Sequence, residues 1–361
     1  MKILHIHPSL ECGGIEAMIC SLANQMVNNH DVSVCTIFRP TDSDSFLNKL
    51  DKNISVYSLD KRKSGFSFVE LIKIYRFICK NDFDVVHLHG FFYYYLLSVF
   101  LLHKRVKFVY TVHSDAIMEN SKWDKRLLFL KKIFFQKKYL EPVTISQTSR
   151  QSFETYYKTS AHLVYNGIPK PSNYNEADPL SAYRYTSDKK IFLHLGRITK
   201  AKNQIVLCQV FDRLIKSGED VVLIIAGTKQ DLNIYSEIEP FLSSRIVYLG
   251  ERSDIVALLK SSDAMCLSSI WEGLPITLLE AFSVGCIPIC TPVGGIPDVI
   301  LSDVNGLLSD DSSEESYYAV IRYFLNLPEE KLHMLSNNAI QSFDKYDIES
   351  IAESYIKIYH S

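Results

Sequence analysis

Two carboxylates eight positions apart, Glu272 and Glu280, lie in the stretch WEGLPITLLE. Proline is favourable in the first turn of a helix because its missing N–H would have no partner there anyway. A helix that begins near Pro275 therefore places Glu280 in its second turn and leaves Glu272 in the preceding loop. The unpaired N–H groups of such a helix start attract negative charge. The stretch predicts an anion site with a carboxylate on either side.

The N–H groups expected to face this anion are those of Leu274, Ile276 and Thr277. A carboxylate repels phosphate, so neither Glu serves mainly to attract it. Carboxylates accept hydrogen bonds from hydroxyl groups, so a ligand with the order diol, phosphate, diol suits the stretch. A nucleoside diphosphate sugar has that order. A helix start with a solvated Glu is the competing interpretation, and the apolar run around Glu280 disfavours it.

A second group of charges lies in GRITKAKNQ, where Arg197 and Lys202 flank a loop that leads from a strand into a helix. Arginine presents a planar fork to phosphate oxygens, and lysine presents a mobile point charge. Together they are suited to a diphosphate leaving group without a divalent ion. Two solvated surface bases are the alternative, and for an isolated pair they would be the better interpretation.

Two further features follow strands of the first half. Gly13 and Gly14 lie between the first strand and a helix, where glycine lets backbone N–H groups approach an anion. A tight turn explains the pair equally well, and the G-x-G-x-x-G pattern of nicotinamide cofactors is absent. His113 ends an inner strand, where a neutral imidazole can bond a hydroxyl or a phosphate oxygen. It is also compatible with a structural histidine.

Strand-length apolar runs alternate with helical patterns along the chain, which predicts parallel sheets covered by helices on both faces. The expected strands are 2–7, 31–38, 53–59, 84–90, 108–114, the start of 143–153, 162–168, 190–197, 221–227, 245–250, 264–269, 286–292 and 306–310. The expected helices include 15–27, 203–217, 233–243, 254–261 and 348–359. Ligands of such sheets bind beyond the carboxyl ends of the strands. The candidate residues follow strands, so they are expected near a cleft between two domains.

Composition and cysteine spacing argue against a disulfide-rich protein and against a membrane-spanning one. A chain of 361 residues with 47% hydrophobic and 22% charged residues is typical of a globular protein with two domains. Residues 1–166 contain 22 Lys/Arg and 15 Asp/Glu, whereas the remainder contains 17 and 26. Eight scattered cysteines without C-x-x-C predict a reducing, cytoplasmic compartment with neither disulfides nor a metal site. The longest apolar run, 91–102, is about half of the roughly 20 residues of a spanning helix.

The motifs together resemble one family. E-G-L-P-x-x-L-L-E-A, preceded some seventy residues earlier by G-R-x-x-x-x-K-N, is similar to the signature of retaining family 4 glycosyltransferases (glycosyl transferases group 1) of bacterial surface-polysaccharide type. Supporting matches are G-G-x-E at 13–16, DVVHLHG at 84–90, TVH at 111–113, YNGI at 165–168, G-x-x-x-D-I at 250–255 and PVGGIPDVI at 292–300. The family often has H-D where this chain has His113-Ser114-Asp115. The resemblance spans nearly the whole chain and implies a GT-B fold.

The resemblance implies an acceptor domain at 1–166, joined by a terminal helix at about 347–361, and a sugar-donor domain at 167–346. It implies catalytic roles for Glu272, His113, Arg197 and Lys202, with front-face displacement, retention and no protein nucleophile. The implied substrate-binding residues are Gly13, Gly14, Arg252, Ser253, Asp254, Gly273, Leu274, Pro275, Ile276, Thr277 and Glu280. In this scheme Glu272 bonds the transferred sugar, Glu280 bonds the ribose, and Arg252 to Asp254 border the nucleobase.

Residues 121–138 predict a basic amphipathic helix, because seven Lys/Arg alternate with aromatic and aliphatic residues. Such a helix lies on an anionic membrane surface or packs its apolar face inward and leaves the bases in water, and both interpretations stand. The first fits an acceptor anchored in lipid. Asp42-Ser43-Asp44 matches a metal motif of another glycosyltransferase fold but reads as a solvated turn. We therefore expect no cofactor, no catalytic metal and no nucleic acid.

The expected activity is that of a metal-independent, hexosyltransferase-type enzyme that uses a UDP-sugar, or another nucleoside diphosphate sugar, and a glycan or polyprenyl-linked acceptor. The enzyme is expected in the cytoplasm, peripheral to the inner face of the membrane. A sugar-nucleotide epimerase or phosphorylase of the same architecture is the first alternative. A phosphorylase would require a pyridoxal site in a longer chain, and nothing marks one. A non-catalytic nucleotide-sugar binding protein is the second alternative.

Overall fold

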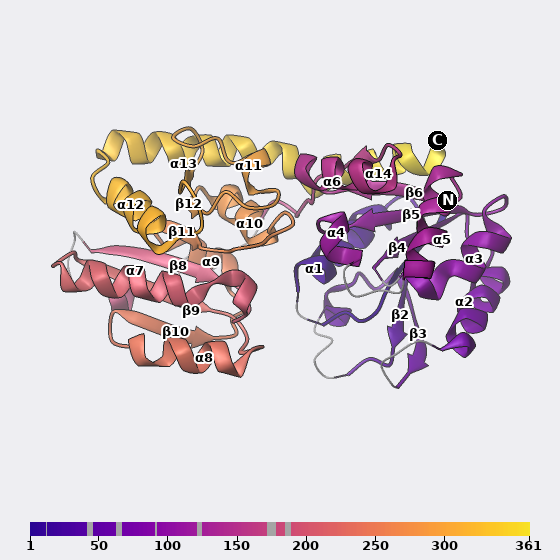
Figure 1. The fold of residues 1–361 in the computed structure, drawn as a ribbon, viewed down its shortest axis with the longest axis horizontal. Coiled ribbons are helices and arrows are strands. Elements are labelled where there is room, and N and C mark those ends of the chain that lie inside the picture. The colour runs from indigo at the N-terminus through magenta and orange to yellow at the C-terminus, as the bar shows by residue number, and fades with distance from the viewer. Residues whose placement is uncertain are drawn as a thin grey trace. The chain divides into compact units, whose positions relative to one another are not determined.

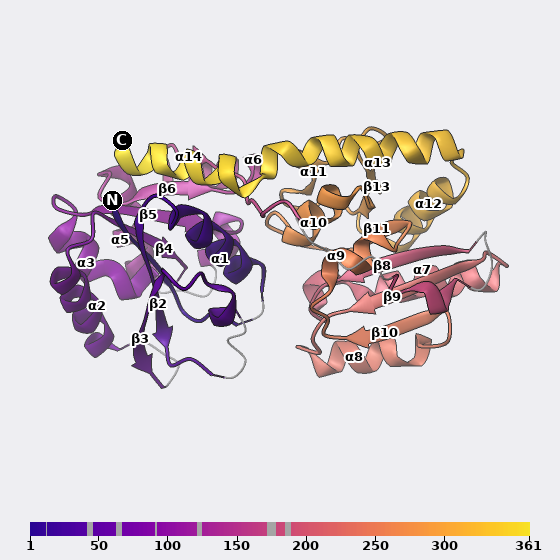
Figure 2. The ribbon, with the colours of Figure 1, turned by 180° about the vertical axis from the view of Figure 1, so that it is seen from behind.

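The computed structural model describes residues 1–11, 13–41, 46–62, 67–90, 92–120, 125–171, 178–184 and 189–361. The chain divides into two compact units. Unit 1 is Met1–Pro169 together with Tyr346–Ser361, and unit 2 is Lys170–Lys345. Each unit is a parallel sheet with helices on its faces (Figure 1, Figure 2). The expected turn at Asp42 to Asp44 lies outside the described residues.

The sheet of unit 1 has the strand order β3-β2-β1-β4-β5-β6-β7. Its strands are β1 (Lys2–His7), β2 (Asp31–Phe38), β3 (Ser55–Lys61), β4 (Val85–His89), β5 (Lys107–Val112), β6 (Glu141–Thr144) and β7 (His162–Leu163). The chain passes outward from β1 to β3 and then resumes at β4 on the other side of β1. The order thus reverses between β1 and β4, and open α/β sheets bind ligands at such a reversal.

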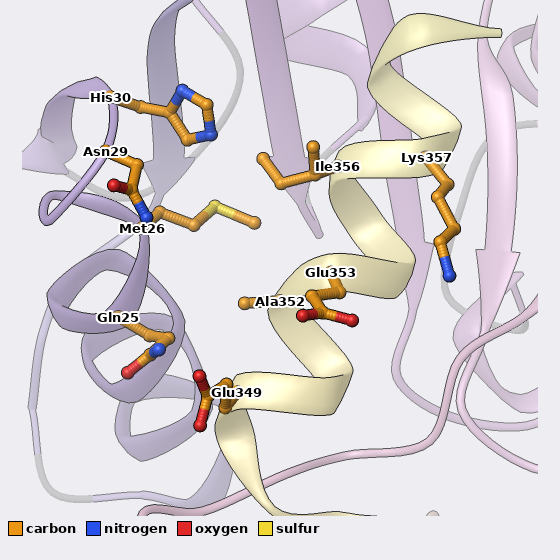
Figure 3. A pocket seen from close by; sticks show the side chains of 9 residues that line it. All are labelled: Gln25, Met26, Asn29, His30, Glu349, Ala352, Glu353, Ile356 and Lys357. Carbon is orange, nitrogen blue, oxygen red and sulfur yellow. The ribbon is translucent and has the colours of Figure 1, made fainter.

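The helices of unit 1 are α1 (Gly14–Met26), α2 (Phe68–Asn81), α3 (Leu96–Leu102), α4 (Ala116–Asn120), α5 (Lys125–Gln136), α6 (Gln147–Tyr157) and α14 (Ile348–His360). The last of these returns to unit 1 and packs beside α1. A hollow of about 300 Å³ lies between the two helices. Figure 3 shows Met26 pointing toward Ala352 and Ile356 across it. Deeper in the unit, the Tyr359 hydroxyl lies 2.7 Å from His87 Nδ1.

Unit 2 has a six-stranded parallel sheet of order β10-β9-β8-β11-β12-β13, which reverses between β8 and β11. Its strands are β8 (Lys190–Leu195), β9 (Val221–Ala226), β10 (Ile246–Gly250), β11 (Ala264–Leu267), β12 (Ile287–Cys290) and β13 (Leu307–Leu308). Its helices are α7 (Gln204–Lys216), α8 (Leu232–Ile238), α9 (Ile255–Lys260), α10 (Ile276–Val284), α11 (Ile296–Val299), α12 (Glu314–Leu325) and α13 (Glu329–Phe343). Strand β9, VVLIIA, is buried along its length, as expected for a strand covered on both faces.

The expected strand at 162–168 is much shorter in the structure. Of 162–168, only His162 and Leu163 pair with β6. The chain then leaves the sheet, because Ile168 exchanges backbone hydrogen bonds with Tyr346 and Ile348 at the start of α14. The run 91–102 contains a 3₁₀ turn, Phe92–Tyr95, followed by the short α3. Within the described ranges, no helix is long and apolar enough to span a bilayer.

The prediction for 121–138 is wrong at Lys131. Helix α5 covers Lys125–Gln136, and residues 121–124 are outside the described ranges. Lys131 is buried at 3% exposure, and its ammonium bonds Glu119 at 2.7 Å and lies 4.5 Å from the centre of the Tyr110 ring. It therefore belongs to the interior rather than to a basic outer face. Phe134 and Phe135 are also buried, so much of the apolar face of α5 packs inward.

Candidate functional site

Two predicted site loops meet in unit 2 beyond the carboxyl ends of the neighbouring strands β8 and β11. The loop after β8 contains Arg197 and Lys202, and the loop after β11 contains Glu272. The backbone N–H of Ile270 donates to Ala201 O at 2.9 Å, and the Ser268 hydroxyl donates to Asn203 O at 3.1 Å. These bonds tie the two loops together at the reversal of the strand order.

The centre of this site is an ion pair between Lys202 and Glu272. Lys202 Nζ lies 2.6 Å from Glu272 Oε1, and the Ser269 hydroxyl donates to the same oxygen at 2.6 Å. Glu272 is only 8% exposed, so its charge requires this compensation. Among the described residues, none donates a hydrogen bond to Oε2 of this carboxylate, which leaves that oxygen to accept from a ligand hydroxyl.

A buried amide and imidazole hold the first loop in place. Gln204 Nε2 donates to Arg197 O at 2.9 Å and lies 3.1 Å from His194 Nε2. The other ring nitrogen of His194 lies 2.9 Å from Cys266 O and therefore carries the proton. Burial, with a smaller contribution from the charge of Lys202, lowers the pKa of His194 to about 4. The neutral ring thus joins β8, β11 and the first residue of α7.

Helix α10 follows the Glu272 loop, as predicted. It begins at Ile276, with Pro275 as its N-cap residue, and Glu280 lies in its second turn, about 6 Å along the axis. Its early N–H groups lack intrahelical acceptors, which favours negative charge at this end. Glu280 is partly buried, and Thr277 is half-buried beside it. The expected order of carboxylate, helix start and carboxylate is present in unit 2.

A glycine outside the predicted set shapes the Glu272 loop. Gly294 has φ +57°, and a Cβ at this position would lie 1.9 Å from Glu272 O. The next residue, Gly295, donates its N–H to Gly273 O at 2.7 Å. The glycines of the motif PVGGIPDVI therefore support the backbone of the Glu272 loop.

Arg197 and Arg252 differ in their surroundings. Arg197 is exposed, and no side chain in the described part of the chain forms an ion pair with it, so its guanidinium is accessible to an anion. Arg252 instead makes a two-bond pair with Asp254, at 2.8 and 2.5 Å. This hydrogen bonding lowers the pKa of Asp254 and raises that of Arg252. With the exposed Ser253 between them, they form a fixed loop after β10.

In unit 1, Gly13 is the N-cap of α1 and Gly14 its first residue. The carboxylate of Glu16, in the first turn of α1, lies against Gly13 and is 3.3 Å from His7 Nε2. This acidic side chain already complements the positive end of the helix. An anionic ligand at Gly13 and Gly14 would therefore meet the Glu16 carboxylate, a feature that the glycine pattern did not reveal.

His113 belongs to a chain of imidazoles from β1, β4 and the end of β5. Its Nε2 lies 3.0 Å from His89 Nδ1, and His89 Nε2 lies 3.4 Å from His5 Nδ1. Burial, followed by the nearby His7, lowers the pKa of His113 to about 3, and burial alone lowers that of His5 to about 4. These rings are neutral at physiological pH, which suits His113 to hydrogen bonding rather than to charge stabilisation.

The imidazole chain also contains three rings close enough to share a cation. One nitrogen from each of His5, His87 and His89 lies within 4.8 Å of the other two. However, both nitrogens of His87 lie 2.7 Å from hydroxyl groups, one of Tyr359 and one of Thr111. A metal ion would have to replace one of these bonds. The geometry therefore favours a structural role for His87, which connects α14 to the sheet.

The sequence did not predict a hollow of about 570 Å³ in unit 1, which lies beyond strands β1, β2 and β3. It is lined by His7, Glu16, Arg39, Lys61 and Arg62, among others. Lys61 is 8% exposed, and its ammonium lies 6.0 Å from the centre of the Tyr94 ring, where its charge also acts on the Glu70 carboxylate. A buried ammonium is favourable only with an anion or a hydrogen-bond acceptor nearby. Only the folded sheet brings these bases, from separate strands, to one hollow.

Comparison with known families accounts for both units. Residues 12–170 match the model "Glycosyltransferase Family 4", and residues 182–342 match "Glycosyl transferases group 1". The chain belongs to the family 4, group 1 glycosyltransferases. The predicted family is thus confirmed, and the two matches together extend over most of this glycosyltransferase.

Curated relatives of this glycosyltransferase include enzymes for lipid-linked glycans. It is 25% identical to a UDP-Gal:alpha-D-GlcNAc-diphosphoundecaprenol alpha-1,3-galactosyltransferase of Escherichia coli, with 89% of this chain and 82% of the relative covered. It is 24% identical to a Campylobacter jejuni alpha-1,4-N-acetyl-D-galactosaminyltransferase that acts on a diNAcBac-PP-undecaprenol glycan, with 99% and 98% covered.

Solved structures confirm the predicted GT-B fold. The protein HepE of Anabaena, in complex with UDP and glucose, superposes with a TM-score of 0.81 over 100% of this chain and 99% of that chain, at 18% identity. A TarM variant of S. aureus superposes with a TM-score of 0.79 over all of both chains, at 13% identity. The glycosyltransferase thus has two parallel-sheet α/β domains of this architecture.

The buried imidazoles predict acid sensitivity of the fold. His5 and His194, with pKa values of about 4, bind a proton near pH 6.5 once unfolded. Their contribution to stability is complete above pH 6.5 and is lost as the pH falls through about 4, with roughly tenfold change in the unfolding equilibrium per pH unit and group. Urea unfolding from pH 7.5 to 4.5 measures this slope. His5→Gln should reduce it, the exposed His333→Gln should not, and equal slopes in all three proteins would contradict the assignment.

The contact of Gly294 predicts a large effect of one methyl group. Gly294→Ala adds both a left-handed backbone cost and a clash with Glu272 O, so its thermal midpoint should fall by several degrees. Gly218→Ala is the matched control, because Gly218 has φ +94° in unit 2 but no heavy atom within 4 Å of the added Cβ. Equal decreases of the thermal midpoint in Gly294→Ala and Gly218→Ala would contradict the predicted clash with Glu272 O.

Proposed function

We propose that this glycosyltransferase transfers a sugar, with retention, from a UDP-sugar to a glycan or lipid-linked glycan in surface-polysaccharide synthesis. The Lys202–Glu272 pair at the start of α10 is the observation that carries the proposal, because it sets a cation and a hydroxyl acceptor side by side. The diphosphoundecaprenol acceptors of the relatives support the lipid-linked acceptor. The UDP complexes of HepE support the nucleotide.

Charge stabilisation of the leaving diphosphate would be the main source of catalysis. Arg197 is exposed and suited to two phosphate oxygens, while Lys202 moves from Glu272 to share its charge with the diphosphate. We propose that these two cations act without a divalent ion or other cofactor, and that the displacement proceeds on one face without a protein nucleophile.

The remaining site residues would position the two ends of the sugar donor. Glu272 Oε2 would accept from a sugar hydroxyl, and Glu280 from the ribose. The backbone from Gly273 to Thr277 would contact phosphate and sugar, and the Arg252–Asp254 loop would border the base. In unit 1, we assign His113 to the sugar, Gly13 and Gly14 to backbone contacts with the sugar donor, and the hollow with Lys61 to the acceptor. The same proposal places the enzyme in the cytoplasm, peripheral to the inner face of the membrane.

Nucleotide release from a panel of UDP-, GDP- and ADP-sugars tests the activity. We expect release of UDP from one UDP-sugar, stimulated by a lipid-linked glycan and unchanged by EDTA. Proton NMR of the product should show the anomeric configuration of the sugar donor. Epimerised sugar without acceptor would identify an epimerase, and binding without turnover a binding protein, and either result would overturn the transferase assignment.

Variants of the two carboxylates test their separate roles. Glu272→Gln should lower kcat/KM at least about tenfold, because it weakens both the ion pair and the bond to the sugar. Glu280→Gln should act mainly on KM, since a ribose contact is equal in the ground and transition states. Glu239→Gln, an exposed carboxylate of the same unit, is the control. Wild-type rates in both Glu272→Gln and Glu280→Gln would overturn the assignment of the two carboxylates to sugar and ribose.

A further inference from the structure

Three helices of unit 1 present large apolar side chains to solvent on one face. Figures 1 and 2 show α2, α3 and α5 near one another at the same end of unit 1. The exposed apolar residues of these helices are Phe68, Val69, Ile72, Phe100, Leu101, Phe129 and Leu130. Phe68 is 73% exposed and Phe100 is 59% exposed. Clusters of this kind on a globular protein mark an interaction surface.

The apolar residues surround a hollow of about 720 Å³. Phe68 and Leu71 of α2, Leu97 and Phe100 of α3, and Leu130 of α5 line it. Among the residues that the structure describes, Lys137 is the one charged residue of its lining. A space of this chemistry accepts hydrocarbon, while the cost of desolvation disfavours polar ligands. We name the exposed apolar residues and this hollow the α2–α3–α5 face.

One end of this face is basic. The His103 ring, just after α3, stacks on Tyr139 after α5 at 3.8 Å, and Arg105 pairs with Asp82 after α2. The carboxyl ends of the three helices therefore converge. Among the described side chains, the exposed bases of these helices and of the turns after them are Lys73, Arg76, Lys80, Lys104, Arg105, Lys137 and Lys138. The one acidic residue of α2, α3 and α5 is Glu70, which is buried and paired with Lys73, and in the turn after α2 the exposed Asp82 is paired with Arg105.

We infer that the α2–α3–α5 face docks on an anionic lipid bilayer, with Phe68 and Phe100 entering the acyl boundary and the basic end at the headgroups. Apolar protrusions beside lysines fit this environment, because long basic side chains reach headgroups while their neighbours are in hydrocarbon. Anionic lipid attracts each such base. The proposed docking surface includes α2 and α3 as well as α5. It excludes Lys131, whose ammonium is paired with Glu119 inside the unit.

Co-sedimentation of the full chain with vesicles tests the face without any turnover. Vesicles of phosphatidylglycerol and phosphatidylcholine should bind the protein, and pure phosphatidylcholine should bind it more than about tenfold less. The double variant Phe68→Ser/Phe100→Ser and the triple variant Lys104→Glu/Lys137→Glu/Lys138→Glu should each lose more than about tenfold in partition. High salt should weaken binding of the wild type and leave a weaker, apolar component.

Matched controls come from unit 2. Leu232→Ser removes a side chain that is 69% exposed, and Lys216→Glu reverses an exposed base, and both should bind vesicles like the wild type. Circular dichroism and turnover of the sugar donor should show that the variants are folded. Wild-type binding by both face variants overturns the inference. It is also overturned if the face instead joins two copies, with sedimentation showing a wild-type dimer that the apolar variant converts to a monomer.

Discussion

Burying a carboxylate requires compensation, and in unit 2 that compensation is Lys202. Glu272 is held in the loop after β11 by Lys202 and Ser269, and Lys202 arrives there from the loop after β8. The pair is possible because β8 and β11 are adjacent although some seventy residues separate their loops. Gln204, His194 and Gly294 hold the two backbones in register. A ligand that draws Lys202 toward itself removes part of the charge compensation of the buried Glu272 carboxylate.

Unit 1 also buries titratable side chains, but it stabilises them in a different way. Strands β1 and β4 and the end of β5 carry imidazoles, and burial keeps His5 and His113 neutral. His87 bonds Tyr359 of the final helix, so the end of the chain is attached to the centre of the first sheet. The neutral cluster and the cationic hollow with Lys61 lie at the carboxyl ends of neighbouring strands. One sheet edge thus combines hydrogen-bonding groups with groups that suit an anion.

The helices around the first sheet divide their apolar residues between two environments. Phe134 and Phe135 of α5 enter the core, where Lys131 sits among aromatic rings and bonds Glu119. Phe68 of α2 and Phe100 of α3 remain in solvent with the bases beside them. The positive balance of residues 1–166 therefore has a spatial counterpart, because bases outnumber acids on the exposed surface of these helices.

The sequence alone determined the alternation of strands and helices, the family, and the place of Glu272 before a helix and Glu280 in its second turn. These follow from local period and from residue types near one another in the chain. Tertiary structure decided which charged side chains are buried or paired within the protein. Lys131 is interior, Arg252 is paired with Asp254, and Glu16 occupies the start of α1, whereas Arg197 remains exposed. Burial and pairing depend on neighbours distant in sequence, and helical spacing cannot distinguish a lysine in water from one enclosed by aromatic rings.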